Sequence, residues 1–177
     1  MSHADLVGAI DQLPSTPWAG QAFRHVAAGR AALSGEGARL IGGRWNPKAS
    51  FPVLYLGLSR AVVLAEFHRL ATRQGLPPES FLPRTFFTYE VDLKALLDLR
   101  DPTVRGAVGL DDHDLTADLL VPCQAVGEAA HACGREGVLV PGAAGRGDVL
   151  AAFVSRLGST SSLKDIAAEQ WESVPEK

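Results

Sequence analysis

The chain has 177 residues, of which 46% are hydrophobic and 21% charged, and its formal net charge is −3 at pH 7. These values are ordinary for a globular domain with a buried core, so we expect a single domain over residues 1–177. A net negative charge does not suggest the basic surface with which proteins bind duplex nucleic acid. The longest apolar runs are too short to span a membrane. Residues 1–14 lack a basic segment followed by a long apolar run. We therefore expect no signal peptide and a cytoplasmic protein.

The first half of the chain is predicted to place two strands and two helices around a long glycine-rich loop. Ser59 is suited to begin the second helix, and Gly75 followed by Pro77 to end it. A loop as long as residues 29–52 inside a compact domain is typical of a functional segment. The elements expected here are an N-terminal helical segment at 1–20 with its helix at 4–12, strands at 21–28 and 53–59, and a helix at 60–74.

The second half is predicted to contain more strands than helices. We expect the terminal helix to pack through Trp171 on the domain itself, with a partner protein as the alternative. The order of elements is mixed and shows no regular β-α-β alternation, which favours an α+β fold. The elements expected here are strands at 84–93, 95–99, 138–141 and 148–154, an acidic turn leading into a helix at 111–120, a helix at 124–137, a tight turn at 142–147 and a helix at 160–177, with 103–109 ambiguous.

The potential metal ligands of the chain do not predict a metal site. Cys123 and Cys133 lack CxxC-type pairing, and with His131 nearby they give only three potential ligands, so we expect two free thiols in a reducing compartment. The acidic run at residues 111–114 precedes a predicted helix, where aspartates commonly cap the helix and interact with its dipole.

Several common catalytic and nucleotide-binding motifs are missing from the sequence. The glycine pairs in "GEGARLIGG" and "GAAGRG" do not open a helix directly after a strand with GxGxxG spacing, and there is no GxxxxGK[ST] sequence. There is also no GxSxG elbow and no HExxH. Dinucleotide binding of the Rossmann or P-loop kind, α/β-hydrolase chemistry and zinc-protease chemistry are therefore not supported.

Glu66 lies inside the apolar stripe of the predicted helix 60–74, which runs through Val62, Val63, Phe67 and Leu70. A carboxylate on the core side of a helix needs a partner, and an arginine is the usual one. One interpretation is therefore a purely structural ion pair between Glu66 and Arg24 or Arg44. The other is that the helix points Glu66 into a binding site.

The polar residues around these elements describe a pocket that cleaves a nucleotide. Arg24 interrupts the strand at 21–28, and Arg44 ends the glycine-rich loop. Two arginines suit a pyrophosphate, because the planar guanidinium bonds two oxygens at once. Tyr55, on the less hydrophobic face of its strand, could stack on a flat heterocycle. A single enclosed carboxylate, Glu66, could stabilise positive charge developing at a ribose C1.

The segment "FRHV…GEGARLIGGRWNPKASFPVLYLGLSRAVVLAEF" resembles the RES domain, the toxin partner of Xre-type antitoxins. The family is named for an arginine, a glutamate and a serine. The resemblance is close over residues 23–70, which hold the arginine-bearing strand, the GGRWN loop and the AxxE helix. It continues less closely over residues 124–154, in "EGVLVPGAAGRGDVLAAF".

The resemblance implies a fold, an activity and a partner. RES proteins have an ADP-ribosyltransferase-like fold, in which a mixed, split β-sheet with flanking helices surrounds an NAD cleft. Family toxins consume NAD as a substrate without a metal, by cleaving the nicotinamide–ribose bond in hydrolysis or phosphorolysis. The alternative activity is ADP-ribosyl transfer to a protein target. An Xre-type antitoxin that covers the cleft is the implied partner.

The resemblance also implies roles for individual residues. Arg24 and Arg44 match the family's arginines and are assigned to the NAD phosphates or ribose. Tyr55 matches the aromatic residue on the nicotinamide side. Glu66 matches the family's glutamate, which would stabilise the oxocarbenium ion or hold the ribose hydroxyls. Asn46, in the GGRWN motif, is assigned to the binding site as well.

Two positions depart from the family pattern. Gly142 stands where the family's serine is expected after a proline, and a glycine offers no hydroxyl to the ligand or to the glutamate. His25 stands where many members carry an aromatic residue, and an imidazole could still stack or donate a hydrogen bond. Both belong to the expected binding site. The change at Gly142 leaves open a third alternative, a catalytically impaired module that binds only nucleotide or partner.

Overall fold

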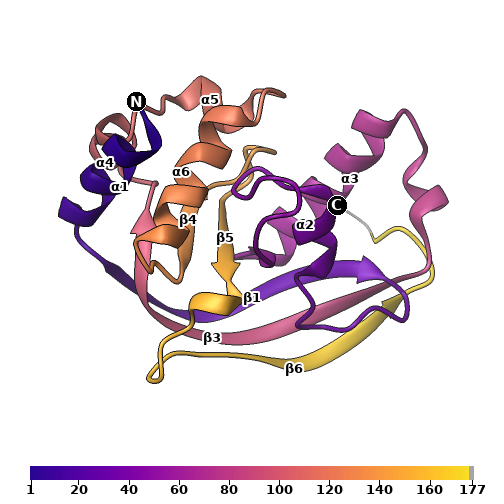
Figure 1. The fold of residues 1–177 in the computed structure, drawn as a ribbon. Coiled ribbons are helices and arrows are strands. Elements are labelled where there is room, and N and C mark those ends of the chain that lie inside the picture. The colour runs from indigo at the N-terminus through magenta and orange to yellow at the C-terminus, as the bar shows by residue number, and fades with distance from the viewer. Residues whose placement is uncertain (176–177) are drawn as a thin grey trace.

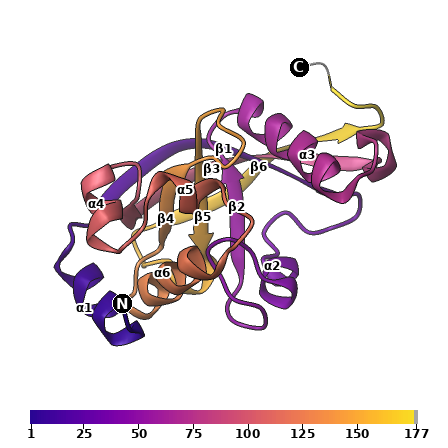
Figure 2. The same ribbon diagram turned by 90° about the horizontal axis from the view of Figure 1, so that it is seen from above.

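The computed structural model describes residues 1–175, and α-helices and β-strands alternate irregularly along them. Figures 1 and 2 show this arrangement from two directions. The α-helices are α1 (His3–Gln12), α2 (Glu36–Ile41), α3 (Arg60–Gln74), α4 (Pro102–Ala107), α5 (Asp112–Thr116) and α6 (Val121–Ala132). The strands are β1 (Thr16–Ala27), β2 (Val53–Gly57), β3 (Arg84–Asp98), β4 (Gly137–Pro141), β5 (Asp148–Phe153) and β6 (Ser162–Trp171), and two short 3₁₀ helices are η1 (Pro78–Phe81) and η2 (Val154–Arg156).

The strands form one mixed sheet in the order β1-β2-β5-β4-β3-β6, and β1 also pairs with β3. Only β3 and β4 are parallel among these pairs in the described residues. The β1–β3 pairing runs from Thr16 opposite Leu96 to Ala27 opposite Arg84, whereas β1 meets β2 only at Phe23 opposite Gly57. The sheet therefore splits into a long ribbon of β1, β3 and β6, seen along the bottom of Figure 1, and a shorter group of β2, β4 and β5. This is the expected α+β class with a mixed, split sheet.

The apolar core lies on both faces of the short strands. The residues of β2 alternate between two faces, because Val53 packs toward α1 and α6 while Leu54 and Leu56 pack toward the β1–β3 ribbon. A third cluster joins α3 to the far end of the ribbon through Phe67, Phe86 and Trp171. Each face of β2 is thus covered by a different layer.

Helix α3 begins and ends where the sequence predicts. The Ser59 hydroxyl accepts a hydrogen bond from the Val62 amide, and Gly75 adopts the left-handed conformation with φ of 64°. Val62, Val63 and Phe67 are buried, as the apolar stripe requires. The acidic run also behaves as predicted, since Asp111 and Asp114 form a reciprocal capping box at α5.

The expected helices at the two ends of the chain were wrong in part. Helix α1 is present, but residues 16–20 of the expected N-terminal helical segment belong to β1, because they pair with β3. The expected helix at 160–177 is instead β6, which pairs with residues 84–92 of β3. Alanine, glutamate and glutamine favour a helix locally, yet without β6 this edge of β3 would be unpaired. Residues 176–177 of that expectation lie outside the described part.

Three interior expectations also need correction. The loop expected at 29–52 contains the short helix α2, and the ambiguous stretch at 103–109 forms most of α4. The two strands expected at 84–93 and 95–99 are the single strand β3. The helix expected at 124–137 is α6, which begins three residues earlier and ends at Ala132.

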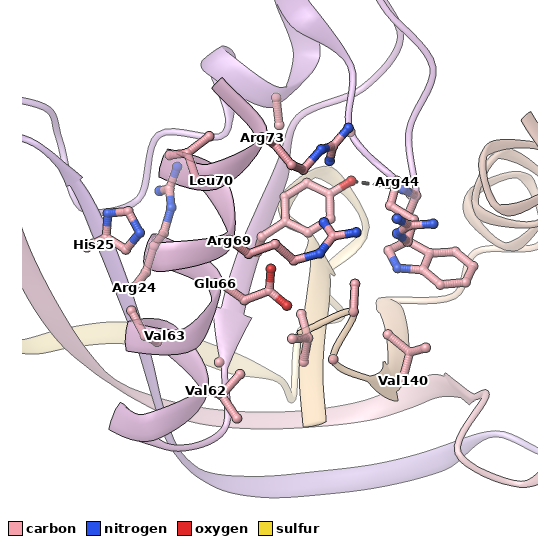
Figure 3. A pocket seen from close by; sticks show the side chains of 18 of the residues that line it. Arg24, His25, Arg44, Val62, Val63, Glu66, Arg69, Leu70, Arg73 and Val140 are labelled. Atoms are coloured by element: carbon pink, nitrogen blue, oxygen red, sulfur yellow. Dashed lines mark hydrogen bonds between the residues drawn. The ribbon is translucent and has the colours of Figure 1, made fainter. Parts of the chain in front are cut away.

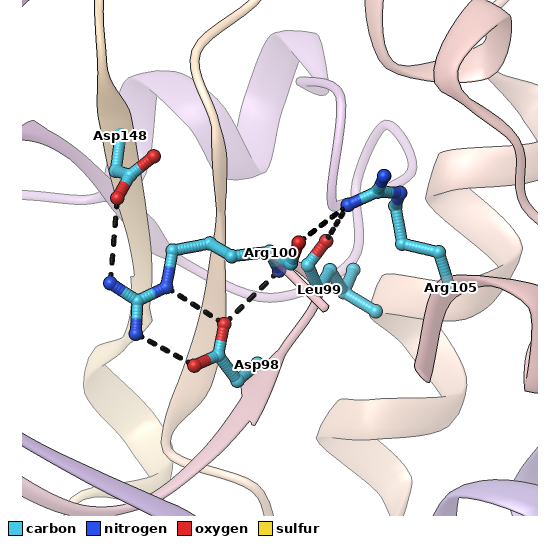
Figure 4. Close-up of polar contacts among 5 residues, drawn as sticks. All are labelled: Asp98, Leu99, Arg100, Arg105 and Asp148. Carbon is cyan, nitrogen blue, oxygen red and sulfur yellow. Dashed lines mark hydrogen bonds and ion pairs between the residues drawn. The ribbon is translucent and has the colours of Figure 1, made fainter. Parts of the chain in front are cut away.

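An ion-pair network connects the end of β3 to the start of β5. Arg100 binds Asp98 through Nε and Nη2, at 2.9 and 2.7 Å, and reaches Asp148 at 3.4 Å (Figure 4). Arg105 in α4, which is buried, donates to the carbonyl oxygens of Leu99 and Arg100, both at 2.8 Å. These contacts fix the point at which the chain leaves the sheet and enters α4.

No helix within residues 1–175 is long and apolar enough to cross a membrane. Both cysteines are free thiols; Cys123 is buried and Cys133 is half-buried.

Replacing Trp171 by alanine is expected to destabilise the protein by about 3–5 kcal/mol, because a large buried ring would leave a cavity. Trp171 packs on its own domain, with its ring stacked 4.9 Å from that of Phe86 and lying 6.0 Å from that of Phe67. Urea unfolding followed by circular dichroism measures the change. The control is Ile166→Ala, since Ile166 lies on the same strand but is 50% exposed. Equal losses in the two variants would show that β6 is not held by Trp171.

Candidate active site

A cavity of about 720 Å³ opens between α2, α3, β1 and the turn that follows β4. Its lining includes Tyr55 of β2 and Glu66 of α3, together with Gly142 of the turn, which is far from both in the sequence. Figure 3 shows these elements around the cavity, with α3 forming one wall. The site thus draws on both halves of the split sheet.

Glu66 points from α3 into the cavity, as its place in the apolar stripe suggested (Figure 3). Its Oε1 accepts a hydrogen bond of 3.0 Å from the backbone amide of Ala144, in the turn after β4. Within residues 1–175 its Oε2 has no hydrogen-bond partner. One oxygen is therefore fixed and the other is available to a ligand.

The structural ion pair between Glu66 and Arg24 or Arg44, one of the two interpretations of the sequence, does not form within the described residues. Arg24 instead donates to the carbonyl oxygens of Ser34 and Ala32, at 3.2 and 3.4 Å. It thereby contacts the loop that leads to α2. Arg24 and Arg44 both still line the cavity.

Arg44 donates to the carbonyl oxygens of Asp114 and Ala117, both at 2.9 Å. These atoms lie at the C-terminal end of α5, where helix carbonyls lack partners within the helix. The guanidinium therefore joins the GGRWN loop to the segment that follows α5.

Arg69 and Arg73 also line the cavity, and the sequence reasoning missed both. They follow Glu66 by three and seven residues in α3, so all three share one face of the helix. That spacing was the available signal. Arg69 donates to the Thr116 carbonyl oxygen at 3.2 Å, and Arg73 forms an exposed ion pair with Asp118 at 3.4 Å.

Tyr55 contributes its ring to the cavity wall, while its hydroxyl is engaged elsewhere. The hydroxyl donates to Asn46 Oδ1 at 2.7 Å and accepts from the Trp45 amide at 2.9 Å. Burial raises the pKa of Tyr55 well above its usual range, so the phenol stays neutral. Tyr55 can offer a flat surface to a ligand, but it is not placed as an acid or base.

Asn46 does not line the cavity, although the sequence assigned it to the binding site. It is fully buried, and its side-chain amide donates to the Ala38 carbonyl oxygen at 2.7 Å. Together with Tyr55 it holds the loop that carries Arg44. The structure thus places Asn46 behind the site as a support.

His25 lines the far end of the cavity next to an aromatic cluster. Its Nδ1 accepts a hydrogen bond of 3.1 Å from Arg84 Nε, and its ring lies edge-on to Phe67 and parallel to Trp171. Burial, and then the charges of Arg84 and Arg24, lower the pKa of His25 to about 3. The imidazole is therefore neutral at physiological pH.

Gly142 lies close to Glu66, as the resemblance to the family implied. A Cβ added to Gly142 would stand 3.7 Å from Glu66 Oε1, but only 2.8 Å from the Gly147 carbonyl oxygen. A larger residue would therefore force the turn at 142–147 to shift. The same turn already supplies a donor to Glu66, through the Ala144 amide.

The cavity brings four arginines and one carboxylate together. The arginines are Arg24, Arg44, Arg69 and Arg73, and Glu66 is the single acidic residue among the described lining residues. Clustered guanidinium groups suit an anionic ligand such as a diphosphate. No cluster of three or more His, Cys, Asp or Glu residues suited to a metal occurs within residues 1–175.

The model of the RES domain family matches residues 17–172 of the chain, a span that contains every residue of the cavity. The proteins named NAD(+) phosphorylase MbcT of Mycobacterium tuberculosis (strain H37Rv) and of Mycobacterium bovis are each 41% identical over 153 residues. Each match covers 85% of this chain and 82% of the relative. The crystal structure of the M. tuberculosis MbcT–MbcA toxin–antitoxin complex gives a TM-score of 0.86 at 38% identity, covering 94% of this chain and 92% of that one.

Replacing Gly43 by alanine is expected to destabilise the protein by about 1–3 kcal/mol, because its Cβ would overpack the site. That Cβ would lie 2.3 Å from the Tyr55 hydroxyl oxygen, which is fixed by Asn46 and Trp45. Thermal unfolding measures the loss. Gly37→Ala is the matched control, since an added Cβ there meets nothing within 4 Å. If both variants unfold alike, the Tyr55 cluster does not hold the loop.

The low pKa of His25 predicts a specific loss of stability in acid. The folded value of about 3 lies below the ordinary 6.5, so the unfolded chain binds a proton in this range while the folded protein does not. The contribution is present above pH 6.5 and is lost as the pH falls. Between pH 6.5 and 4 the natural protein should lose about 3 kcal/mol more than His25→Phe. Urea unfolding across this range tests it, and parallel pH profiles would contradict it.

Proposed function

This chain belongs to the RES domain family, and on that premise we propose that it is an NAD-cleaving toxin of a toxin–antitoxin system. The bond cleaved is the one between nicotinamide and ribose. The observation that carries the proposal is the cavity itself, in which Glu66 lies among four arginines. The names of the relatives, NAD(+) phosphorylase and toxin–antitoxin complex, support both parts. The proposal treats residues 1–177 as one RES-like domain acting in the cytoplasm.

Arg24 and Arg44 would hold the diphosphate or ribose of NAD. A diphosphate carries two full negative charges, and each guanidinium can bond two of its oxygens. Arg44 enters the cavity from the loop and Arg24 from β1, so they would contact the ligand from different sides. The flat ring of Tyr55 would pack against the nicotinamide end. His25 is neutral because of its low pKa, and since its Nδ1 accepts from Arg84, its Nε2–H would donate one hydrogen bond at the far end of the cavity.

Glu66 would stabilise the charge that develops when the bond to nicotinamide breaks. Nicotinamide leaves with the electron pair of the C–N bond and becomes neutral, while positive charge develops at the ribose C1. A carboxylate fixed beforehand stabilises such a charge without rearranging during the reaction. The Ala144 amide provides this fixing by binding Oε1, which leaves Oε2 toward the cavity. An oxygen of inorganic phosphate then forms the new bond to C1, the acceptor that the relatives' name favours.

The impaired-module alternative rests on Gly142, which has no hydroxyl. The contact expected of a serine there is a hydrogen bond to the glutamate or ligand. In this chain the Ala144 amide, two residues later in the same turn, donates to Glu66. This observation favours an active enzyme over a module that only binds.

The proposed partner is an Xre-type antitoxin that covers the cavity. Exposed apolar side chains flank the opening on two sides, with Ile41 of α2 79% exposed and Leu119 and Val121 67% and 63% exposed. Ile41 and Leu120 both line the cavity, so these positions lie at its rim. Large exposed apolar residues around a pocket are typical of a protein-binding surface.

The Glu66→Gln variant is expected to release nicotinamide from NAD at least about a hundredfold more slowly than the natural chain, because the charge at C1 is no longer compensated. A glutamine can still accept from the Ala144 amide, so the free energy of unfolding should change by less than about 1 kcal/mol. Release is followed by chromatography, with and without inorganic phosphate.

The matched control is Glu36→Gln, since Glu36 is exposed and pairs with Arg39 outside the cavity lining. Its rate should equal that of the natural chain. Full turnover by folded Glu66→Gln would overturn the assignment. Turnover that does not depend on phosphate would point to hydrolysis or to transfer onto another acceptor.

A further inference from the structure

Three cavity arginines converge on one short stretch of backbone, residues 114–118. Arg44 bonds the carbonyl oxygens of Asp114 and Ala117 at 2.9 Å, and Arg69 bonds that of Thr116 at 3.2 Å. Arg73 pairs with Asp118 at 3.4 Å. These guanidinium groups come from two separate elements, the GGRWN loop and α3, yet they all reach the end of α5.

The atoms that these arginines contact resemble an anionic ligand in their electrostatics. The last carbonyls of a helix have no partners within it and carry partial negative charge. Asp118 adds a full negative charge next to them. The end of α5 therefore occupies the donors that a diphosphate in the same cavity would use.

We propose that Arg44, Arg69 and Arg73 form the subsite for the diphosphate of NAD, and that residues 116–118, each of which contacts one of these arginines, occupy this subsite until the substrate displaces them. The inference rests on the proposed function and adds to it two binding residues, Arg69 and Arg73, and a segment that moves. A phosphate displaces a carbonyl because a charged, bidentate contact to a guanidinium is stronger than a neutral one.

The other end of α5 is held independently of the cavity. Arg105 pairs with Asp112 Oδ1 at 2.6 Å, and Leu115 is buried in the core beside α6. Figure 4 shows Arg105 bound in turn to the backbone at the end of β3. The C-terminal end of α5 can therefore leave the arginines while its N-terminal end stays in place.

The opposing interpretation is that these arginines only cap α5. A capping role predicts that removing Arg69 lowers the stability of the protein and leaves substrate binding unchanged. A diphosphate subsite predicts the reverse, a weaker substrate complex with little change in the fold. Measuring KM and kcat separately distinguishes the capping role from the diphosphate subsite, because loss of a substrate contact raises KM.

In steady-state assays of nicotinamide release, Arg69→Gln should raise the KM for NAD by about ten- to a hundredfold, because one charge-assisted contact is lost. The kcat should change by less than about threefold, since Arg69 would bind the substrate equally before and during the reaction. Arg69→Lys, which keeps the charge and loses the fork, should lie in between. The matched control is Arg39→Gln, a half-buried arginine outside the cavity lining, which should keep the natural KM. A natural KM in Arg69→Gln would overturn the inference.

Hydrogen exchange of the natural chain, with and without inorganic pyrophosphate, tests the displacement directly. Occupation of the arginines by pyrophosphate should speed exchange of the amides in residues 116–119 and leave those of α6 unchanged. Unchanged or slower exchange in that segment would overturn the inference. This measurement needs no NAD cleavage. If the natural chain releases no nicotinamide, the proposed function fails, while the exchange result still decides whether the subsite exists.

Discussion

The pairing of β1 with β3 is the constraint on which the rest of the structure depends. It extends along almost the full length of both strands, and it leaves β3 free to pair with β6 and β4 on its other edge. Because β1 meets β2 at a single position, the sheet opens between the two groups of strands. The cavity lies at this opening, so the split that makes the site is a direct result of where the long pairing stops.

Buried contacts of Trp45 and Asn46 fix the loop that brings Arg44 into the cavity. Trp45 is buried against α6, and an added Cβ at Gly127 would lie 2.0 Å from the Trp45 carbonyl oxygen, so this contact requires a glycine. Asn46 and Tyr55 then bond each other across the loop and β2. Three consecutive residues of the GGRWN motif thus have different roles. Arg44 faces the cavity, and the buried side chains of Trp45 and Asn46 hold the loop that carries it.

The cavity keeps its positive and negative side chains apart, and backbone groups contact both. Four guanidinium groups close together repel one another, and carbonyl oxygens from residues 32–34 and 114–117 offset this repulsion without neutralising it. Glu66 stays apart from that set, because a backbone amide holds its carboxylate. A site that keeps its cations and its carboxylate unpaired with each other can offer both to one ligand.

The sequence by itself determined the features that depend on near neighbours. The caps of α3, the alternation in β2, the capping box at α5 and the position of Glu66 in an apolar stripe all follow from residues a few positions apart. The motif from Phe23 to Phe67 also identified the family. Only the tertiary structure decided that the last segment is a strand, that Asn46 lies behind the site and that Arg69 and Arg73 meet the end of α5. Those outcomes depend on contacts between residues that are distant along the chain, where local preference carries no information and the pairing of open strand edges and the satisfaction of helix carbonyls prevail.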